Sequence, residues 1–135
     1  GFEPEPGMLV PDIATWQALH ADLGRPAAFG MTLDIGHCRA VEPVDVPDCV
    51  GVAAEHLVNV QIDDARRGVH EHLEFGAGEI DFPPVLRALT DSGYRGLVSV
   101  ELPRHSHAAP DTARRSLAFL RDAENRATAG EGALA

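Results

Sequence analysis

The sequence has few cysteines and no long apolar stretch. Two cysteines in 135 residues, Cys38 and Cys49, are too few for a disulfide framework and lack the spacing of a cysteine metal site. Free thiols in a reducing compartment are the simpler expectation, so we expect a cytoplasmic protein. No run approaches the roughly 18 apolar residues that a membrane-spanning helix requires, and we therefore expect no membrane partner.

Basic residues are also scarce. The chain has 11 Lys and Arg against 21 Asp and Glu, which gives a formal net charge of −10. A surface of that sign repels phosphate backbones and anionic lipids, so nucleic acid is not an expected partner. A bound metal ion would still reverse the sign of the potential inside a pocket.

The length of the chain is too small for one common architecture. A complete eight-stranded α/β barrel needs about 250 residues, whereas this chain has 135 and begins with Gly1 rather than Met. We therefore expect a fragment of a larger fold, or a homo-oligomer that completes it. The 44% of hydrophobic residues is sufficient for a folded core.

Short apolar runs alternate with helical patterns along the chain. Strands buried on both faces are predicted at residues 31–34, 57–62 and 97–102. Helices are predicted at residues 11–23, 47–56, 81–92 and 110–126, where Gly24 and Gly93 terminate the first and third. This alternation predicts parallel strands with right-handed crossovers, either in a doubly wound sheet or in an arc of a barrel.

Oxygen-bearing side chains stand at the C-terminal ends of the strands, where parallel α/β folds gather their functional groups. Four residues occupy such positions: Glu3, Asp34, Gln61 and Glu101. Each of them alone is explained equally well as a solvated strand end or a helix cap. Three converging carboxylates, however, would repel one another unless a cation neutralised them. Carboxylate and amide oxygens favour Mg²⁺ or Mn²⁺, so the set predicts a divalent-metal site.

A histidine follows the first of these strands closely. In the segment 33–38 (LDIGHC), Gly36 lets the chain turn directly off the strand, so that His37 folds back over the site. A structural or surface role is the alternative for a single histidine.

The segment 63–72 (DDARRGVHEH) is dense in titratable groups. Its arginines could bind an anionic or polyhydroxy substrate through their forked donors. His70 and His72 would point to the same side of an extended backbone, which suits a metal or substrate contact. An exposed, salt-bridged loop is the alternative for this segment.

Four motifs follow one another along the chain: LDIGH (33–37), VNVQIDD (58–64), GAGEIDF (76–82) and VSVE (98–101). In this order they resemble the second half of the xylose isomerase-like TIM-barrel superfamily. That superfamily includes sugar and sugar phosphate isomerases and epimerases and, more distantly, the endonuclease IV class of abasic-site nucleases. The resemblance covers nearly all of residues 1–123. It implies that residues 1–126 form parallel (β/α) units of the C-terminal half of a TIM barrel, and that residues 127–135 form a flexible tail.

The resemblance also implies a metal held by four side chains: Glu3, Asp34, Gln61 and Glu101. The family has a histidine at the position of Gln61. Because a glutamine offers a weaker carbonyl ligand, Mn²⁺ or Mg²⁺ becomes better suited than Co²⁺ or Zn²⁺.

Substrate contacts are implied for His37, Arg67 and His72, of which His72 matches a metal histidine of the nucleases. His70 stands where the nucleases have an aspartate. This mismatch and the acidic charge of the chain weigh against a nuclease.

Three functions are therefore open. The first is an isomerase or epimerase acting on a sugar or sugar phosphate, in which Glu3 and Glu101 transfer a proton next to a metal-polarised carbonyl; half a barrel would be inactive by itself. The second is a phosphodiesterase of the abasic-endonuclease type with several Zn²⁺ ions. The third is a degenerate, non-catalytic copy, which Gln61 would explain.

Overall fold

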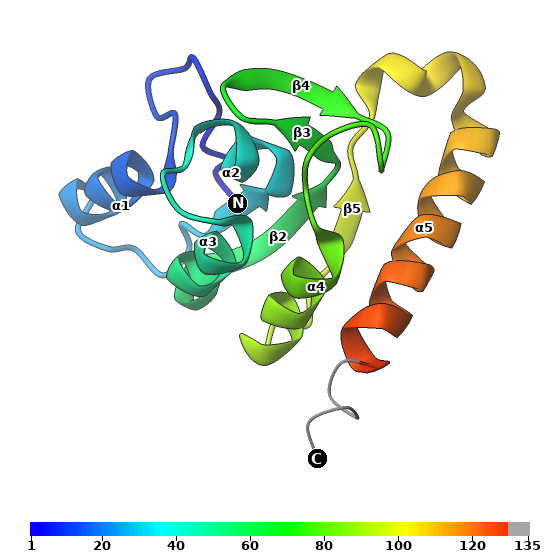
Figure 1. Ribbon diagram of the computed structural model, residues 1–135. Coiled ribbons are helices and arrows are strands. Elements are labelled where there is room, and N and C mark those ends of the chain that lie inside the picture. Colours follow the sequence, from blue (N-terminus) through cyan, green and yellow to red (C-terminus); the bar gives the residue numbers. More distant parts are fainter. Residues whose placement is uncertain (130–135) are drawn as a thin grey trace.

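The structure is a computed structural model that describes residues 1–129. Its central layer is a sheet of three parallel strands, in the order β1 (Met31–Asp34), β2 (Leu57–Ile62), β5 (Val98–Val100). Phe2 forms a parallel bridge to Met31, so the N-terminal segment lies along the other edge of β1. Four successive segments therefore run side by side in one direction (Figure 1). This confirms the predicted parallel (β/α) units of a TIM barrel.

Five α-helices accompany the sheet: α1 (Ile13–Asp22), α2 (Ile35–Val41), α3 (Val46–Ala53), α4 (Phe82–Asp91) and α5 (Ala109–Ala129). Short 3₁₀ turns occupy Ala54–His56 and Pro103–Ala108. Beyond the C-terminal end of β2, an antiparallel hairpin of β3 (Asp64–Arg66) and β4 (Val69–Leu73) lies over α2 (Figure 1). Within residues 1–129, none of the helices combines the length and the apolar character needed to cross a bilayer.

The hydrophobic core lies between the sheet and the helices. All four residues of β1 are buried, as predicted for a strand covered on both faces. Val60 and Ile62 of β2 are fully buried and belong to the same core as Phe82 and Val85 of α4. This packing fixes the direction of the strands, and with it the positions of their C-terminal ends.

The strands predicted at 31–34 and 57–62 have the observed bounds, whereas the third strand is limited to residues 98–100. Two elements were not predicted, namely helix α2 and the hairpin β3–β4. Each follows directly after a strand. The sequence indicates a turn where α2 forms and a loop where the hairpin forms.

The prediction of burial on both faces is wrong for β5, in which Val98 and Val100 are each 40% exposed. Within the described residues β5 has β2 as its single neighbouring strand. A groove of about 560 Å³ also lies beside β5, where residues of α4 and α5 line it together with Tyr94 and Val98. The strand therefore has neither a second partner nor a closely packed helix.

The buried face of α5 is formed mainly by small side chains. The buried residues of this helix are Thr112, Ser116, Ala123 and Ala127, whereas Leu117 is 51% exposed. Stacking of Phe119 on Phe75, at 5.2 Å between ring centroids, sets the rotation of the helix. The helix also continues to Ala129, and the remaining residues of the predicted tail, 130–135, lie outside the described residues.

Candidate metal centre

Asp34 lies at the junction of β1 and α2 and is 2% exposed. Its Oδ1 accepts a hydrogen bond of 2.9 Å from the backbone N–H of His37, which caps the first turn of α2. Its Oδ2 has no hydrogen-bond partner among residues 1–129. The parallel register pairs Asp34 with Gln61 on β2. Asp34 therefore has one oxygen engaged in the helix cap and one oxygen available to a ligand.

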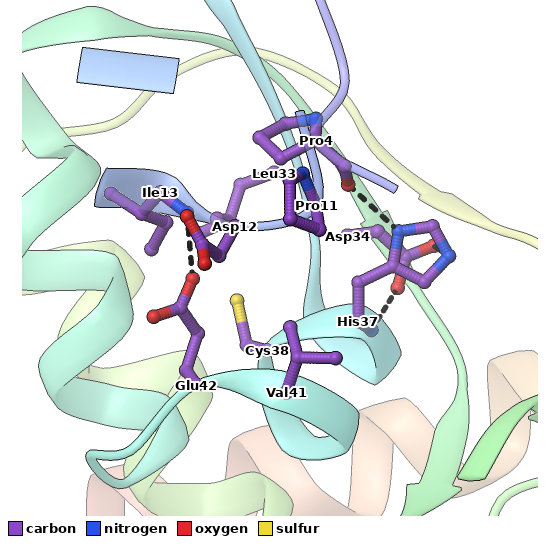
Figure 2. A pocket seen from close by; sticks show the side chains of 10 residues that line it. All are labelled: Pro4, Pro11, Asp12, Ile13, Leu33, Asp34, His37, Cys38, Val41 and Glu42. Atoms are coloured by element: carbon purple, nitrogen blue, oxygen red, sulfur yellow. Dashed lines mark hydrogen bonds and ion pairs between the residues drawn. The ribbon is translucent and has the colours of Figure 1, made fainter. Parts of the chain in front are cut away.

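The first turn of α2 brings His37 back toward the N-terminal segment. His37 Nδ1 lies 3.1 Å from the carbonyl oxygen of Pro4 (Figure 2). The same nitrogen lies 3.5 Å from Glu3 Oε1. His37 Nε2 lies 4.0 Å from Asp34 Oδ2. Contacts through His37 thus connect the segment that contains Glu3 to the end of β1.

Gln61 and Glu101 come together at the ends of β2 and β5. The side-chain amide of Gln61 donates a hydrogen bond to Glu101 Oε2. Because the NH₂ group is engaged in this way, the carbonyl oxygen Oε1 of Gln61 is the free end of the amide. This oxygen is buried and has no hydrogen-bond partner within the described residues. Gln61 therefore has a carbonyl oxygen that a ligand could approach.

The hairpin β3–β4 places two histidines beside this group. Its turn contains Gly68 with φ of 75°, a conformation that glycine adopts without strain. His70 Nε2 lies 3.0 Å from His37 Nε2, and His72 Nδ1 lies 2.6 Å from Asp63 Oδ2. The rings of His70 and His72 are 5.6 Å apart, so the prediction that both point to one side is confirmed.

One buried carboxylate holds the base of the hairpin in place. Asp64 accepts hydrogen bonds from the backbone N–H groups of Gly76, Gly78 and Ile80, at 2.8, 2.9 and 3.1 Å. It also accepts one from Ala65 at 2.9 Å. These bonds explain the motif GAGEIDF in structural terms, because the turn wraps around Asp64. Asp64 thus fixes the position from which β4 projects its histidines.

Asp63 is a candidate ligand that the sequence analysis missed. It follows β2 directly and is fully buried. Neither of its oxygens has a hydrogen-bond partner among residues 1–129. The alternation of a strand places it on the same side as Gln61, two residues earlier. Extending that alternation past the end of β2 would have identified Asp63 from the sequence.

The carboxylates perturb one another strongly. Burial, together with the charges of Asp34 and Glu101, raises the pKa of Asp63 to about 9. Burial also raises the pKa of Glu3 to about 7, with an additional contribution from the charge of Asp34. Without a cation, the site therefore favours protons on carboxylates that would be ionised in water at neutral pH.

The imidazole of His70 experiences the opposite pKa shift. Partial burial lowers the pKa of His70, and the neighbouring rings of His37 and His72 lower it further. A neutral imidazole keeps a free lone pair, which is the form that binds a metal ion.

The donor set fits a divalent cation. Four buried oxygens have no hydrogen-bond partner among the described residues: Asp34 Oδ2, Gln61 Oε1, Asp63 Oδ1 and Asp63 Oδ2. Three groups have ligand atoms within 4.8 Å of one another: Glu3–Asp34–His37, Asp34–Asp63–His72 and His37–His70–His72. Unpaired buried oxygens are costly in a folded protein, and a cation would satisfy them.

Arg67 lies apart from these groups. Its guanidinium donates to the backbone carbonyl of Glu42, and its backbone N–H donates to Glu79 Oε2 at 3.3 Å. The other residues predicted for the site, including Glu3 and Glu101, lie at the strand ends and in the hairpin.

A cavity of about 10 Å³ lies beside Asp34, His37 and Cys38 (Figure 2). Glu42 also lines it and accepts a hydrogen bond of 2.7 Å from the backbone N–H of Ile13. A cavity of this volume has room for about one water molecule, so it is not a substrate pocket.

Comparison with known proteins gives the same architecture. A family model described as "Xylose isomerase-like TIM barrel" matches residues 1–123. The chain is 34% identical over 74 residues to the uncharacterized protein MJ1311 of Methanocaldococcus jannaschii, which covers 54% of this chain and 25% of that protein. It is 32% identical over 74 residues to the L-ribulose-5-phosphate 3-epimerases UlaE of Salmonella paratyphi A and Escherichia coli, covering 55% of this chain and 26% of each relative. The matched part thus spans about a quarter of these relatives. The family match extends over most of the chain, which therefore belongs to the xylose isomerase-like TIM-barrel family.

Proposed function

We propose that this chain carries the metal-binding and proton-transfer residues of an isomerase or epimerase that acts on a sugar or sugar phosphate. One observation carries the proposal: Glu3 and Glu101 come from the two outer segments of the parallel layer and flank Asp34 and Gln61. Two carboxylates on opposite sides of a common centre suit a reaction in which one removes a proton and the other returns one.

The relatives support this class of substrate. Two of them are named for 3-epimerisation of L-ribulose 5-phosphate. Such a reaction moves a proton at a carbon next to a carbonyl group, which requires a base, an acid and stabilisation of the negative charge that develops.

The metal ligands in this proposal are Glu3, Asp34, Gln61 and Glu101. Their oxygens favour Mn²⁺ or Mg²⁺ over a metal that prefers nitrogen or sulfur. When bound, the ion would polarise the substrate carbonyl and acidify the adjacent carbon-bound proton.

Proton transfer and substrate binding are assigned to individual side chains. Glu101, oriented by the hydrogen bond from Gln61, removes the carbon-bound proton. Glu3, with a pKa raised to about 7 by burial, exchanges a proton with the substrate near neutral pH. His37 and His72 contact substrate oxygens from the side of α2 and the hairpin. A substrate contact by Arg67 would require it to leave the carbonyl of Glu42.

Proton exchange with solvent tests this proposal. The intact protein is incubated with L-ribulose 5-phosphate and Mn²⁺ in D₂O, and incorporation of deuterium is followed by NMR. The variant Glu101→Gln should lose exchange by at least about 100-fold, the usual contribution of a general base. Glu55→Gln, at an exposed glutamate of the 3₁₀ turn after α3, serves as the control and should exchange normally. Exchange at an unchanged rate in Glu101→Gln would exclude the assigned role.

Metal binding distinguishes the proposal from a non-catalytic copy. A specific ligand stabilises the folded state in proportion to its occupancy. The melting temperature of the intact protein should therefore rise on addition of Mn²⁺ after treatment with EDTA. A melting temperature that does not change at millimolar Mn²⁺ would favour the non-catalytic copy.

A further inference from the structure

The turn of the hairpin β3–β4 is attached to the rest of the molecule by hydrogen bonds. Residues 66–70 are all exposed, so burial of apolar surface does not hold them in place. Asp64 fixes the base of the hairpin. The contacts of the turn therefore decide how the other end lies, and with it the positions of His70 and His72.

Arg67 attaches the turn to the C-terminal end of α2. Its guanidinium donates a hydrogen bond to the backbone carbonyl of Glu42, the C-cap residue of this helix. The backbone N–H of Gly68 donates to the carbonyl of Ala40 at 2.9 Å. The last carbonyls of a helix have no partner within the helix, and they form its negative dipole end, which a guanidinium stabilises. The turn of the hairpin thus caps α2.

Glu79 attaches the same turn from the loop 76–80. Its Oε2 accepts a hydrogen bond from the backbone N–H of Arg67 at 3.3 Å and another from Arg39 Nε at 3.2 Å. Arg39 belongs to α2. The backbone N–H of Glu79 donates in turn to the carbonyl of Ala65 at 2.9 Å. The hairpin, α2 and the loop are therefore joined at one point, and Arg67 takes part in two of the attachments.

This arrangement places the guanidinium of Arg67 away from the strand ends. Helix α2 begins after its N-cap Asp34 and ends at its C-cap Glu42. At a rise of about 1.5 Å per residue, these two caps are about 12 Å apart along the helix. A substrate contact, which the family resemblance implies for Arg67, would break the bond to Glu42 and release the turn.

We propose that Arg67 is a positioning residue, which fastens the turn of the hairpin to the C-terminal end of α2 and so holds His70 and His72 over the strand ends. The inference deepens the proposed function and rests on it, because His72 contacts a substrate oxygen in that function. Arg67 acts on the reaction through His72 and does not bind the substrate.

Hydrogen exchange of the intact protein, in EDTA and without substrate, tests the attachment. Amides of residues 64–73 should exchange about 10-fold faster in Arg67→Ala, because a hydrogen bond from a charged group is lost. Arg67→Lys keeps one charged donor and should restore most of the protection. Arg95→Ala is the control, since this exposed arginine donates only to the carbonyl of its neighbour Tyr94, and it should exchange like the wild type. Equal exchange in Arg67→Ala and the wild type would overturn the proposal.

The imidazole NMR signals report on the histidines themselves. In Arg67→Ala the signals of His70 and His72 should shift or broaden, and Arg67→Lys should return them toward the wild-type positions. The signal of His20 in α1, which stacks on Trp16, should stay unchanged in both variants. Unchanged signals of His70 and His72 in Arg67→Ala would show that the turn does not set their positions, and the positioning role would be wrong.

The kinetics with L-ribulose 5-phosphate separate positioning from a direct substrate contact. A positioning role predicts a loss of kcat/KM in Arg67→Ala that Arg67→Lys largely restores. A forked contact with the substrate predicts a KM that is raised about 10-fold in both variants, because lysine lacks the two parallel donors of arginine. That second pattern would overturn the proposal.

A second variant covers the case in which Arg67→Ala does not fold. Glu79→Ala removes the acceptor of the Arg67 backbone N–H and should expose the same amides to exchange. Unchanged exchange in Glu79→Ala would then overturn the proposal. An inactive wild type in which exchange and the histidine signals respond as expected would overturn the proposed function and leave the attachment through Arg67 supported.

Discussion

The carboxylate of Asp63 occupies the volume that a side chain at residue 36 would need. A Cβ at Gly36 would lie 2.1 Å from Asp63 Oδ1, well inside van der Waals contact, so either α2 or the carboxylate would have to shift. Substitution of Gly36 therefore reports directly on how closely α2 packs over the candidate metal centre.

Gly36→Ala should destabilise the protein by about 1–3 kcal/mol, the usual cost of overpacking a buried site. Gly51→Ala in α3 is the matched control, because a Cβ there meets no atom within 4 Å. Alanine should stabilise that helix by about 0.5–1 kcal/mol. Urea unfolding of both variants in EDTA measures the difference. Equal stability of the two variants would contradict the close packing.

The stability of the metal-free protein should decrease as the pH rises. The pKa of Asp63 increases from 3.8 in the unfolded chain to about 9 in the folded state, chiefly because of burial. The folded state therefore holds a proton that the unfolded state has released throughout this window, so unfolding becomes more favourable with each pH unit. The pKa of Glu3, raised from 4.5 to about 7, acts in the same direction.

Urea unfolding in EDTA between pH 5 and pH 8 measures this effect. Asp63→Asn should reduce the slope of stability against pH and should be more stable than the wild type at pH 8. Exposed Asp48→Asn should follow the wild type. Stability of the wild type that rises toward pH 8 would show that Asp63 is ionised at little cost in the folded state. Affinity for Mn²⁺ should increase over the same range, because the ion competes with protons for the carboxylates.

Removal of the carboxylate of Asp64 should loosen the loop after the hairpin. Asp64→Ala leaves the backbone N–H groups of Gly76, Gly78 and Ile80 without their acceptor. We expect a loss of about 3–5 kcal/mol, because several bonds to a charged group are removed together. Asp81→Ala is the control, since the exposed Asp81 side chain makes no capping hydrogen bond, and its effect should be within about 0.5 kcal/mol.

Hydrogen exchange of residues 76–80 provides the local measurement. Amides in this segment should exchange faster in Asp64→Ala, while the amides of β1 keep their protection. Unchanged protection of the segment would mean that the bonds to Asp64 are not what orders it.

Gln61→His should change the metal preference of the proposed metal site. An imidazole binds Zn²⁺ better than an amide oxygen does, so the ratio of Zn²⁺ to Mn²⁺ affinity should rise by roughly an order of magnitude. Asn59→His, two residues earlier on the same face of β2, is the matched control and should leave the ratio unchanged. Competition titrations measure the ratio. The same ratio in Gln61→His and the wild type would remove Gln61 from the ligand set.

The sequence was most informative where strands are buried. β1 and β2 have their predicted bounds because a short apolar, β-branched run between polar residues has few alternatives inside a parallel sheet. The same pattern locates the C-terminal ends of those strands. It therefore predicts from the sequence alone that Asp34 and Gln61 lie side by side. The exposure of β5 could not be predicted from the same pattern, because it depends on which strands lie beside β5 in the sheet.

The hairpin and Asp63 were missed for a different reason. The pair Arg67–Gly68 between two short extended segments is a hairpin signal, but the many charges around it favoured an exposed loop. Two successive acids, Asp63 and Asp64, also suggest solvent. Their burial depends on the turn of α2 over one and on the loop 76–80 around the other, and these are tertiary contacts that composition does not reveal.

The ligands of the candidate centre come from four separate segments of the chain, from Glu3 to Glu101. A partly folded chain with formed helices and unpaired strands would therefore have no more affinity for the ion than an unfolded peptide. The ion would act only after the sheet is assembled, so its effect would be found in the rate of unfolding and hardly in the rate of folding. Resistance to proteolysis over hours would then depend on the metal supply of the cell.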